Sequence, residues 1–180
     1  MKWKEIESLP CPIARSLAII GDKWTLLILR DIFLGLSRFS QIQASLKISR
    51  HRLSDRLTLL VEEQVLEKQI YDQSRNRSEY RLSTKGLELQ PILLLMAQWA
   101  EKWMPDDDGA LLDYRHRQCE QALKPKVVCG SCDSAIDPQD VLVQAGTGLL
   151  KKSQRGEFAA AEVEKYRRQN GKKNVSSANT

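Results

Sequence analysis

The 180-residue chain has little that would support catalysis. It contains only two histidines, His51 and His116, and no phosphate-binding loop, dinucleotide fingerprint or zinc-protease motif. The pair Gly146-x-Gly148 is too short a signal for a nucleotide site. These absences argue against an enzyme.

Long apolar runs are also missing. The longest, over residues 92–97, falls far short of the ~20 residues that a membrane-spanning helix needs. The first residues, Met1–Glu5, do not begin a secretory signal, because no apolar segment with a small-residue cleavage site follows. We therefore expect a cytoplasmic protein with no membrane partner. Thiols are reduced there, so paired cysteines indicate metal or redox chemistry before disulfides.

Charge is unevenly distributed along the chain. The formal net charge of +5 combines a basic segment over 1–104, an acidic one over 105–150 and a basic tail over 151–180. A basic body and tail are typical of proteins with a polyanionic partner, although charge alone is weak evidence.

Apolar periodicity and capping residues predict five helices and a two-stranded ribbon. The helices are expected over 12–20, 23–34, 39–46, 50–63 and 84–104, the last one kinked at Pro91, and the strands over 66–72 and 78–83. The expected core stripes of the second and fourth helices are Trp24, Leu27, Ile28 and Ile32, and Leu53, Leu57, Leu60 and Val61.

The order of these helices and strands predicts a mainly α (α+β) fold. We expect a winged helix-turn-helix with a two-stranded wing, followed by a small cysteine-containing C-terminal lobe. We expect a DNA-binding and dimerisation domain over 1–104, a C-terminal extension over 105–150, and a partly disordered basic tail over 151–180 with an amphipathic stretch at 157–168.

The helix expected over 50–63 has leucines on one side and positive charge on the other, a shape that fits the major groove of DNA. Arg50 and Arg52 are the candidates for reading guanine, which arginine recognises with two hydrogen bonds. Other residues are candidates for contacting the DNA backbone or the minor groove. Together with the base-reading candidates, the predicted interface is Arg38, Ser49, Arg50, His51, Arg52, Ser54, Arg56, Arg75 and Arg77. The alternative interpretation is that these arginines belong to an ordinary solvated surface helix with no DNA partner. The ribbon that follows the helix disfavours this alternative.

Four potential metal ligands follow the last helix. The pairs His116-x-x-Cys119 and Cys129-x-x-Cys132 have the spacing of a closed, structural zinc site, and buried thiols or a Cys129–Cys132 disulfide are the alternatives. No cofactor is expected to be required for DNA binding itself. A separate cysteine, Cys11, precedes a helix N-terminus, where the helix dipole favours a thiolate.

Several motifs together resemble the HxlR-type winged-helix transcriptional regulators, relatives of the MarR class. The resemblance is carried by Gly21-Asp22-Lys23-Trp24-Thr25-Leu26-Leu27-Ile28-Leu29-Arg30, Gly35, Arg38-Phe39, Ile48-Ser49, Leu53-Ser54, Arg56-Leu57, Glu79-Tyr80, Leu82-Ser83 and Gly86. The chain departs from the family pattern at Leu36, where proline is frequent, in a wing without its usual proline, and at Gln64, where glycine is usual. Gln64 would have to adopt a left-handed or otherwise irregular turn.

The resemblance implies a two-fold dimer built from the first and last helices, and a cysteine-bearing C-terminal extension in longer members. A subset of the family uses a cysteine at the place of Cys11 as a redox switch, and an inert cysteine is the alternative there. The expected function is a sequence-specific, dimeric regulator of transcription on a palindromic operator in double-stranded DNA, modulated by a small effector or by thiol state. The alternative is a zinc-stabilised adaptor for protein or RNA.

Overall fold

The computed structural model describes residues 11–72 and 77–157. The chain divides into two compact units, Met1–Pro125 and Lys126–Thr180. The end of the expected DNA-binding domain at residue 104 stays a prediction. No helix among the described residues is long and apolar enough to cross a membrane.

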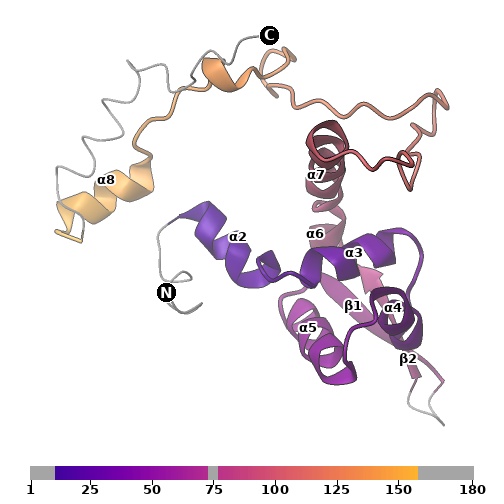
Figure 1. Ribbon diagram of the computed structural model, residues 1–180. Helices are drawn as coiled ribbons and strands as arrows, with labels where there is room; N and C mark the ends of the chain where they lie inside the picture. The colour runs from indigo at the N-terminus through magenta and orange to yellow at the C-terminus, as the bar shows by residue number, and fades with distance from the viewer. Residues whose placement is uncertain (1–10, 73–76, 158–180) are drawn as a thin grey trace. The chain divides into compact units, whose positions relative to one another are not determined.

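Among the described residues, eight elements follow one another in the first unit and two in the second (Figure 1). The first unit contains α2 (Pro12–Ile20), α3 (Thr25–Phe33), α4 (Phe39–Leu46), α5 (Arg50–Glu62), β1 (Leu66–Asp72), β2 (Arg77–Leu82), α6 (Thr84–Leu87) and α7 (Gln90–Trp103). The second contains the 3₁₀ turn η1 (Pro138–Asp140) and α8 (Thr147–Gln154).

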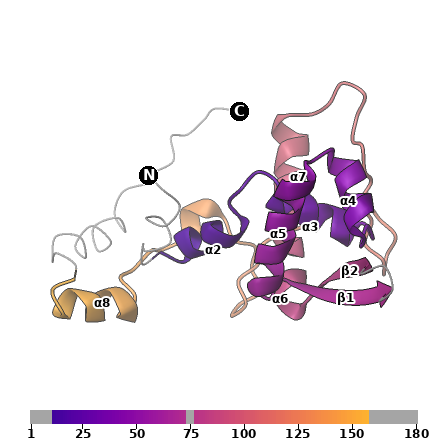
Figure 2. The ribbon, with the colours of Figure 1, turned by 90° about the horizontal axis from the view of Figure 1, so that it is seen from below.

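The helices α3, α4 and α5 pack together, with the β1–β2 ribbon against them (Figure 2). The strands are antiparallel, from the pair Leu66–Leu82 to Asp72–Arg77, with an irregularity between Ile70 and Asp72. The expected winged helix-turn-helix is confirmed.

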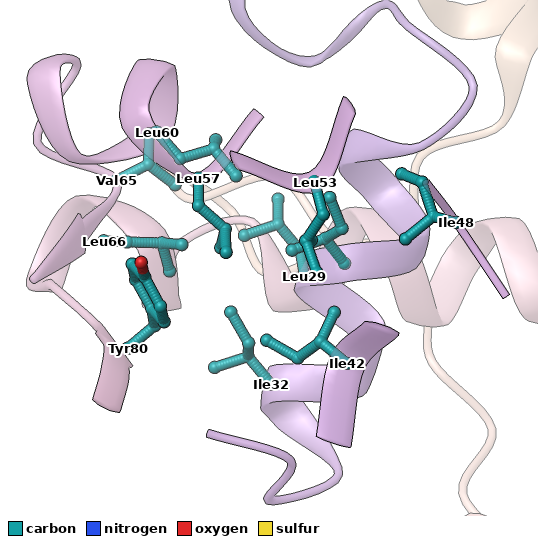
Figure 3. Close-up of a cluster of buried hydrophobic side chains, with 11 residues drawn as sticks. Leu29, Ile32, Ile42, Ile48, Leu53, Leu57, Leu60, Val65, Leu66 and Tyr80 are labelled. Carbon is teal, nitrogen blue, oxygen red and sulfur yellow. The ribbon is translucent and has the colours of Figure 1, made fainter. Parts of the chain in front are cut away.

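The hydrophobic core lies between α3, α4, α5 and the base of the ribbon (Figure 3). The leucines of α5 point inward as its periodicity predicts, since Leu53, Leu57 and Leu60 are fully buried. Tyr80 of β2 is also buried, and this burial raises the pKa of its hydroxyl. The core therefore fixes which face of α5 points outward.

Two expectations about the helices are wrong. Leu27 is 36% exposed, and the buried positions of α3 are Thr25, Ile28, Leu29, Asp31 and Ile32. The helix expected over 84–104 is two helices, because the chain turns at Glu88 and Leu89 and starts again at Gln90. Pro91 lies in the first turn of α7, where its missing N–H is not needed, so it starts a helix and does not kink one.

The chain leaves α5 by a left-handed turn at Gln64, whose φ is 57°, as the departure from glycine predicted. Farther on, Gly86 lies against the backbone beside this turn. A Cβ at Gly86 would come within 2.2 Å of the Val65 carbonyl oxygen, which explains the need for glycine there.

The part of the chain after α6 is poorly buried. Among the described residues, none after Gly86 is buried. The sequence did not predict α8, and all but the first residue of the amphipathic stretch expected over 157–168 lies outside the described residues.

Candidate nucleic-acid interface and cysteine pairs

The outward face of α5 is polar and basic. Ser49 caps the helix, accepting a hydrogen bond from the Arg52 backbone N–H at 3.4 Å. The exposed side chains opposite the leucines include Arg50, His51, Arg52 and Ser54. The structure thus brings these predicted residues together at the start of one helix.

The two candidate base-reading arginines are available at the surface. Within the described residues, neither Arg50 nor Arg52 forms an ion pair, and the Arg50 guanidinium lies 5.6 Å from the centre of the Phe39 ring. His51 Nδ1 lies 2.9 Å from Asp55 Oδ2, one turn along the helix. Both side chains of this pair are exposed, so DNA could readily displace the contact.

Arg56 differs from its neighbours because it is engaged inside the protein. Its Nη1 lies 3.3 Å from Asp22 Oδ2, and both side chains are mostly buried. Asp22 also accepts hydrogen bonds from the Trp24 backbone N–H and the Thr25 hydroxyl at the start of α3. Arg56 therefore positions α5 against α3, and its expected phosphate contact stays a prediction.

Arg38 joins the entry of α4 to the wing. Its Nε lies 3.5 Å from Glu79 Oε1, and its guanidinium stacks 4.8 Å from the centre of the Tyr71 ring. The backbones of Arg38 and Glu79 also form an isolated bridge. With half of its side chain exposed, Arg38 can still reach a ligand beside the wing.

The wing is described only in part. Arg77 is exposed at the start of β2, whereas the predicted residue Arg75 lies outside the described residues. The sequence analysis missed Lys47, which is exposed in the turn between α4 and α5 with a φ of 50°. A lysine in a left-handed turn has no sequence signal comparable to a glycine, so only the fold places its charge beside α5.

A cleft of about 490 Å³ lies between α2, the start of α3 and α5. Its lining combines apolar side chains with charged ones, namely Leu17, Ala18, Asp22, Lys23, Trp24, Arg52, Asp55, Arg56 and Leu59. Two of these residues, Arg52 and Arg56, belong to the predicted interface, so a molecule in the cleft would touch the helix that faces DNA.

Comparison with known families agrees with this geometry. The model of the HxlR-like helix-turn-helix family matches residues 19–108, which include the helix-turn-helix, the wing and α7. This chain belongs to the HxlR-like helix-turn-helix family. It is a transcriptional regulator of the helix-turn-helix type, and the relatives it matches are named as regulators and not as enzymes.

Individual relatives of this HxlR-like regulator match it over more than the family segment. An uncharacterized HTH-type transcriptional regulator of Mycobacterium tuberculosis, Rv3095, is 34% identical over 140 residues, 78% of this chain and 89% of the relative. An alignment of that length continues beyond residue 108, so the relative shares part of the C-terminal extension.

Two solved structures also match this chain over more than the family segment. PA1607, described as a candidate transcription factor, has 34% identity and a TM-score of 0.69, covering 79% of this chain and 99% of its own. PA1374 from Pseudomonas aeruginosa, described in the same way, has 30% identity and a TM-score of 0.54, covering 82% of this chain and all of its own.

The HxlR-like regulator exposes an apolar stripe along α7. Ile92, Met96, Trp99 and Trp103 recur at helical spacing and are 44%, 48%, 58% and 63% exposed. Ile13 and Leu17 of α2 are exposed as well. On another side of α7, residues 112–114 and 122–125 face Leu94 and Ala97 across a cleft of about 280 Å³.

The predicted metal ligands form two pairs. His116 Nδ1 lies 3.4 Å from Cys119 Sγ in the first unit, and Cys129 hydrogen-bonds to Cys132 in the second. Hydrogen bonds from the backbone and then the hydroxyl of Ser134 lower the pKa of the Cys132 thiol. The described residues contain no group of three or more metal-binding side chains.

Cys11 occupies the N-cap of α2, before a helix N-terminus as the sequence predicts, and it is exposed. Its side chain makes no capping hydrogen bond to the start of α2. Like Cys119, Cys129 and Cys132, it is free of disulfides.

Proposed function

We propose that this HxlR-like regulator binds duplex DNA in the cytoplasm by inserting the start of α5 into the major groove and the wing into the adjacent minor groove. The observation that carries the proposal is the exposed basic face of α5, held outward by three buried leucines. Arg50 and Arg52 would read bases, and Ser54, Lys47 and the wing arginines would contact phosphates.

The test is binding to a DNA library followed by titration of the selected duplex. Replacing Arg52 with alanine should cost about 1–3 kcal/mol and relax the preference at one base position. Lys151→Ala removes one exposed charge from α8 and is the matched control. Equal losses for both variants, with unchanged sequence preference, would leave only non-specific attraction and refute the proposal.

We further propose that the regulator acts as a homodimer on a palindromic operator. The support is the apolar stripe on α7 together with Ile13 and Leu17 of α2, since an exposed surface of this kind marks an interface with another protein. A second copy offers the same stripe and allows two-fold pairing. Two recognition helices about 34 Å apart would then meet successive major grooves.

Regulation is proposed to act on the orientation of α5. The cleft beside Arg52 and Arg56 suits a small anion with an apolar body, because Lys23 adds positive charge and Trp24 and Leu59 add apolar walls. Such a ligand would bias one orientation of α5 over another. A thermal-shift screen of aromatic and aliphatic carboxylates tests this, and Lys23→Ala should abolish any stabilisation that is found.

A further inference from the structure

Cys129 and Cys132 lie in one tight turn of the second unit. The Cys132 N–H donates to the Cys129 carbonyl at 3.3 Å, which is the bond between the first and fourth residues of a β-turn. The Asp133 N–H donates to the same carbonyl at 2.8 Å, and the Cys129 N–H donates to the Ser134 carbonyl at 2.9 Å. Three backbone hydrogen bonds therefore hold the two cysteines in one short turn.

A short antiparallel pairing closes this turn. Val128 and Ala135 form an isolated bridge, and the Ile136 N–H donates to the Val127 carbonyl at 2.9 Å. All of these residues belong to the second unit, Lys126–Thr180. The geometry of the turn therefore depends only on contacts within that unit.

The turn brings the two cysteines within the range that a disulfide spans. The first and fourth Cα atoms of a β-turn are less than about 7 Å apart. A disulfide joins cysteines whose Cα atoms are about 4.4–6.8 Å apart. The two side chains also meet already, because Cys129 hydrogen-bonds to Cys132. A bond between the two sulfur atoms therefore requires little movement of the backbone.

The two thiols are free of disulfides and differ in their access to solvent. Cys132 is exposed, whereas Cys129 is partly buried. The backbone and the hydroxyl of Ser134 hydrogen-bond to the Cys132 side chain, which keeps its sulfur beside the turn. A molecule arriving from solvent therefore meets Cys132 first, with Cys129 in contact as the second thiol.

The turn over 116–121 has a similar backbone but a single thiol. Its Glu120 N–H donates to the His116 carbonyl at 2.7 Å, the counterpart of the 2.8 Å bond in the other turn. His116 stands at the place of Cys129, and Cys119 follows it by three residues. Cys119 Sγ lies 3.4 Å from His116 Nδ1 and has no second thiol in its turn. The first turn is therefore an internal control for chemistry that needs two thiols.

We propose that Cys129 and Cys132 form a dithiol site that reacts with small-molecule disulfides and closes into a reversible disulfide within the turn. This bond would be transient in the cytoplasm, where the regulator is proposed to act, because thiols are kept reduced there. Its population would follow the ratio of small disulfides to small thiols. The site lies in a different unit from α5 and the wing, so it is additional to the proposed contact with DNA.

The reaction takes place in two exchange steps. In the first, the Cys132 thiol loses its proton and its sulfur attacks one sulfur of the small disulfide. A mixed disulfide forms, and the other half of the small molecule leaves and takes up a proton. In the second step the Cys129 sulfur attacks the Cys132 sulfur, the internal disulfide forms, and the remaining half leaves as a thiol. The two protein thiols together lose two electrons and two protons, which reduce the small disulfide to two thiols.

The experiment treats the reduced full-length regulator with glutathione at a fixed total concentration and raises the share of glutathione disulfide stepwise. Alkylation then traps the free thiols, and peptide mass spectrometry maps the products. We expect the internal Cys129–Cys132 disulfide at a share at least about tenfold lower than the mixed disulfide of Cys119 needs, because a second thiol in the same turn acts at a high effective concentration. Dithiothreitol should restore both thiols.

Two variants separate the exchange steps. Cys129→Ser should stop the reaction at glutathione on Cys132, whereas the matched control Cys119→Ser should form the internal disulfide as the wild type does. Glutathione on both Cys129 and Cys132, two thiols that stay reduced where Cys119 is modified, or thiols that react only after a chelator removes a metal would each overturn the proposal. The wild-type measurements do not depend on the folding of a variant, and none of the readouts involves DNA.

Discussion

The Arg56 guanidinium meets the Asp22 carboxylate at 3.3 Å and connects the middle of α5 to the turn before α3. The same carboxylate accepts the Trp24 N–H and the Thr25 hydroxyl. One acidic residue thus joins the start of α3 to the helix proposed to read DNA. The Asp22–Arg56 pair therefore contributes to the orientation of α5 against α3.

Replacing Asp22 with alanine should destabilise the fold more than replacing Arg56. The Asp22 carboxylate accepts two further hydrogen bonds, and a hydrogen bond to a charged group contributes about 1.5–3 kcal/mol, whereas a partly exposed ion pair contributes no more than about 1 kcal/mol. Chemical denaturation of both single variants and the double variant measures the coupling between the residues. Strictly additive effects would show that the pair does not link the helices.

Gly86→Ala should lower the free energy of unfolding by about 1–3 kcal/mol, because its Cβ would overlap the Val65 carbonyl. Thermal or urea denaturation measures the change. Gly148→Ala is the matched control, since Gly148 also lies in a helix, α8, and a Cβ there would have nothing within 4 Å. A Gly86 variant as stable as the wild type would mean that Gly86 does not lie against the Val65 carbonyl as described.

Trp99→Asp should convert the proposed dimer into a monomer, because it places a charge in the middle of the α7 stripe. Sedimentation or light scattering gives the mass. Leu142→Asp, at a residue 69% exposed in the second unit, makes the same chemical change elsewhere and should leave the mass unaltered. A wild-type protein that stays monomeric at high concentration would contradict the proposed interface.

Diamide treatment should lower operator affinity through Cys11, which is exposed on α2 beside the proposed interface residue Ile13. A disulfide between Cys11 and the Cys11 thiol of the second copy, with diamide accepting the two electrons and two protons, would displace α2 and alter the dimer. The measurement compares affinity before and after treatment in the wild type and in Cys11→Ser. Equal binding in all four samples would make Cys11 an inert residue.

The sequence predicted the elements whose patterns are local. The helix α4 has the expected bounds, α5 ends one residue early, and the leucines of α5 face the core. Gln64 also adopts the left-handed turn that its place in the family pattern requires. Capping and helical periodicity determine these features within a few residues of the chain, which is why sequence alone suffices.

Features that depend on distant contacts were not predictable. Asp31 is buried because α3 packs against α4, β2 and α7, elements that lie elsewhere in the chain. The ion pair between Asp22 and Arg56 connects two residues that are far apart in the sequence. The turns that hold the two cysteine pairs, over 116–121 and 129–134, have no sequence periodicity, and only their backbone hydrogen bonds show them.

The most direct test of DNA binding through the face of α5 is the affinity for a selected duplex over a range of salt concentrations. The account predicts a steep linear fall of log K with log salt, and a slope reduced by about 1 when Lys47 is replaced by alanine. Arg52→Ala should weaken the selected duplex more than a scrambled one. Affinity independent of salt, or no binding to any duplex at low salt, would contradict the account.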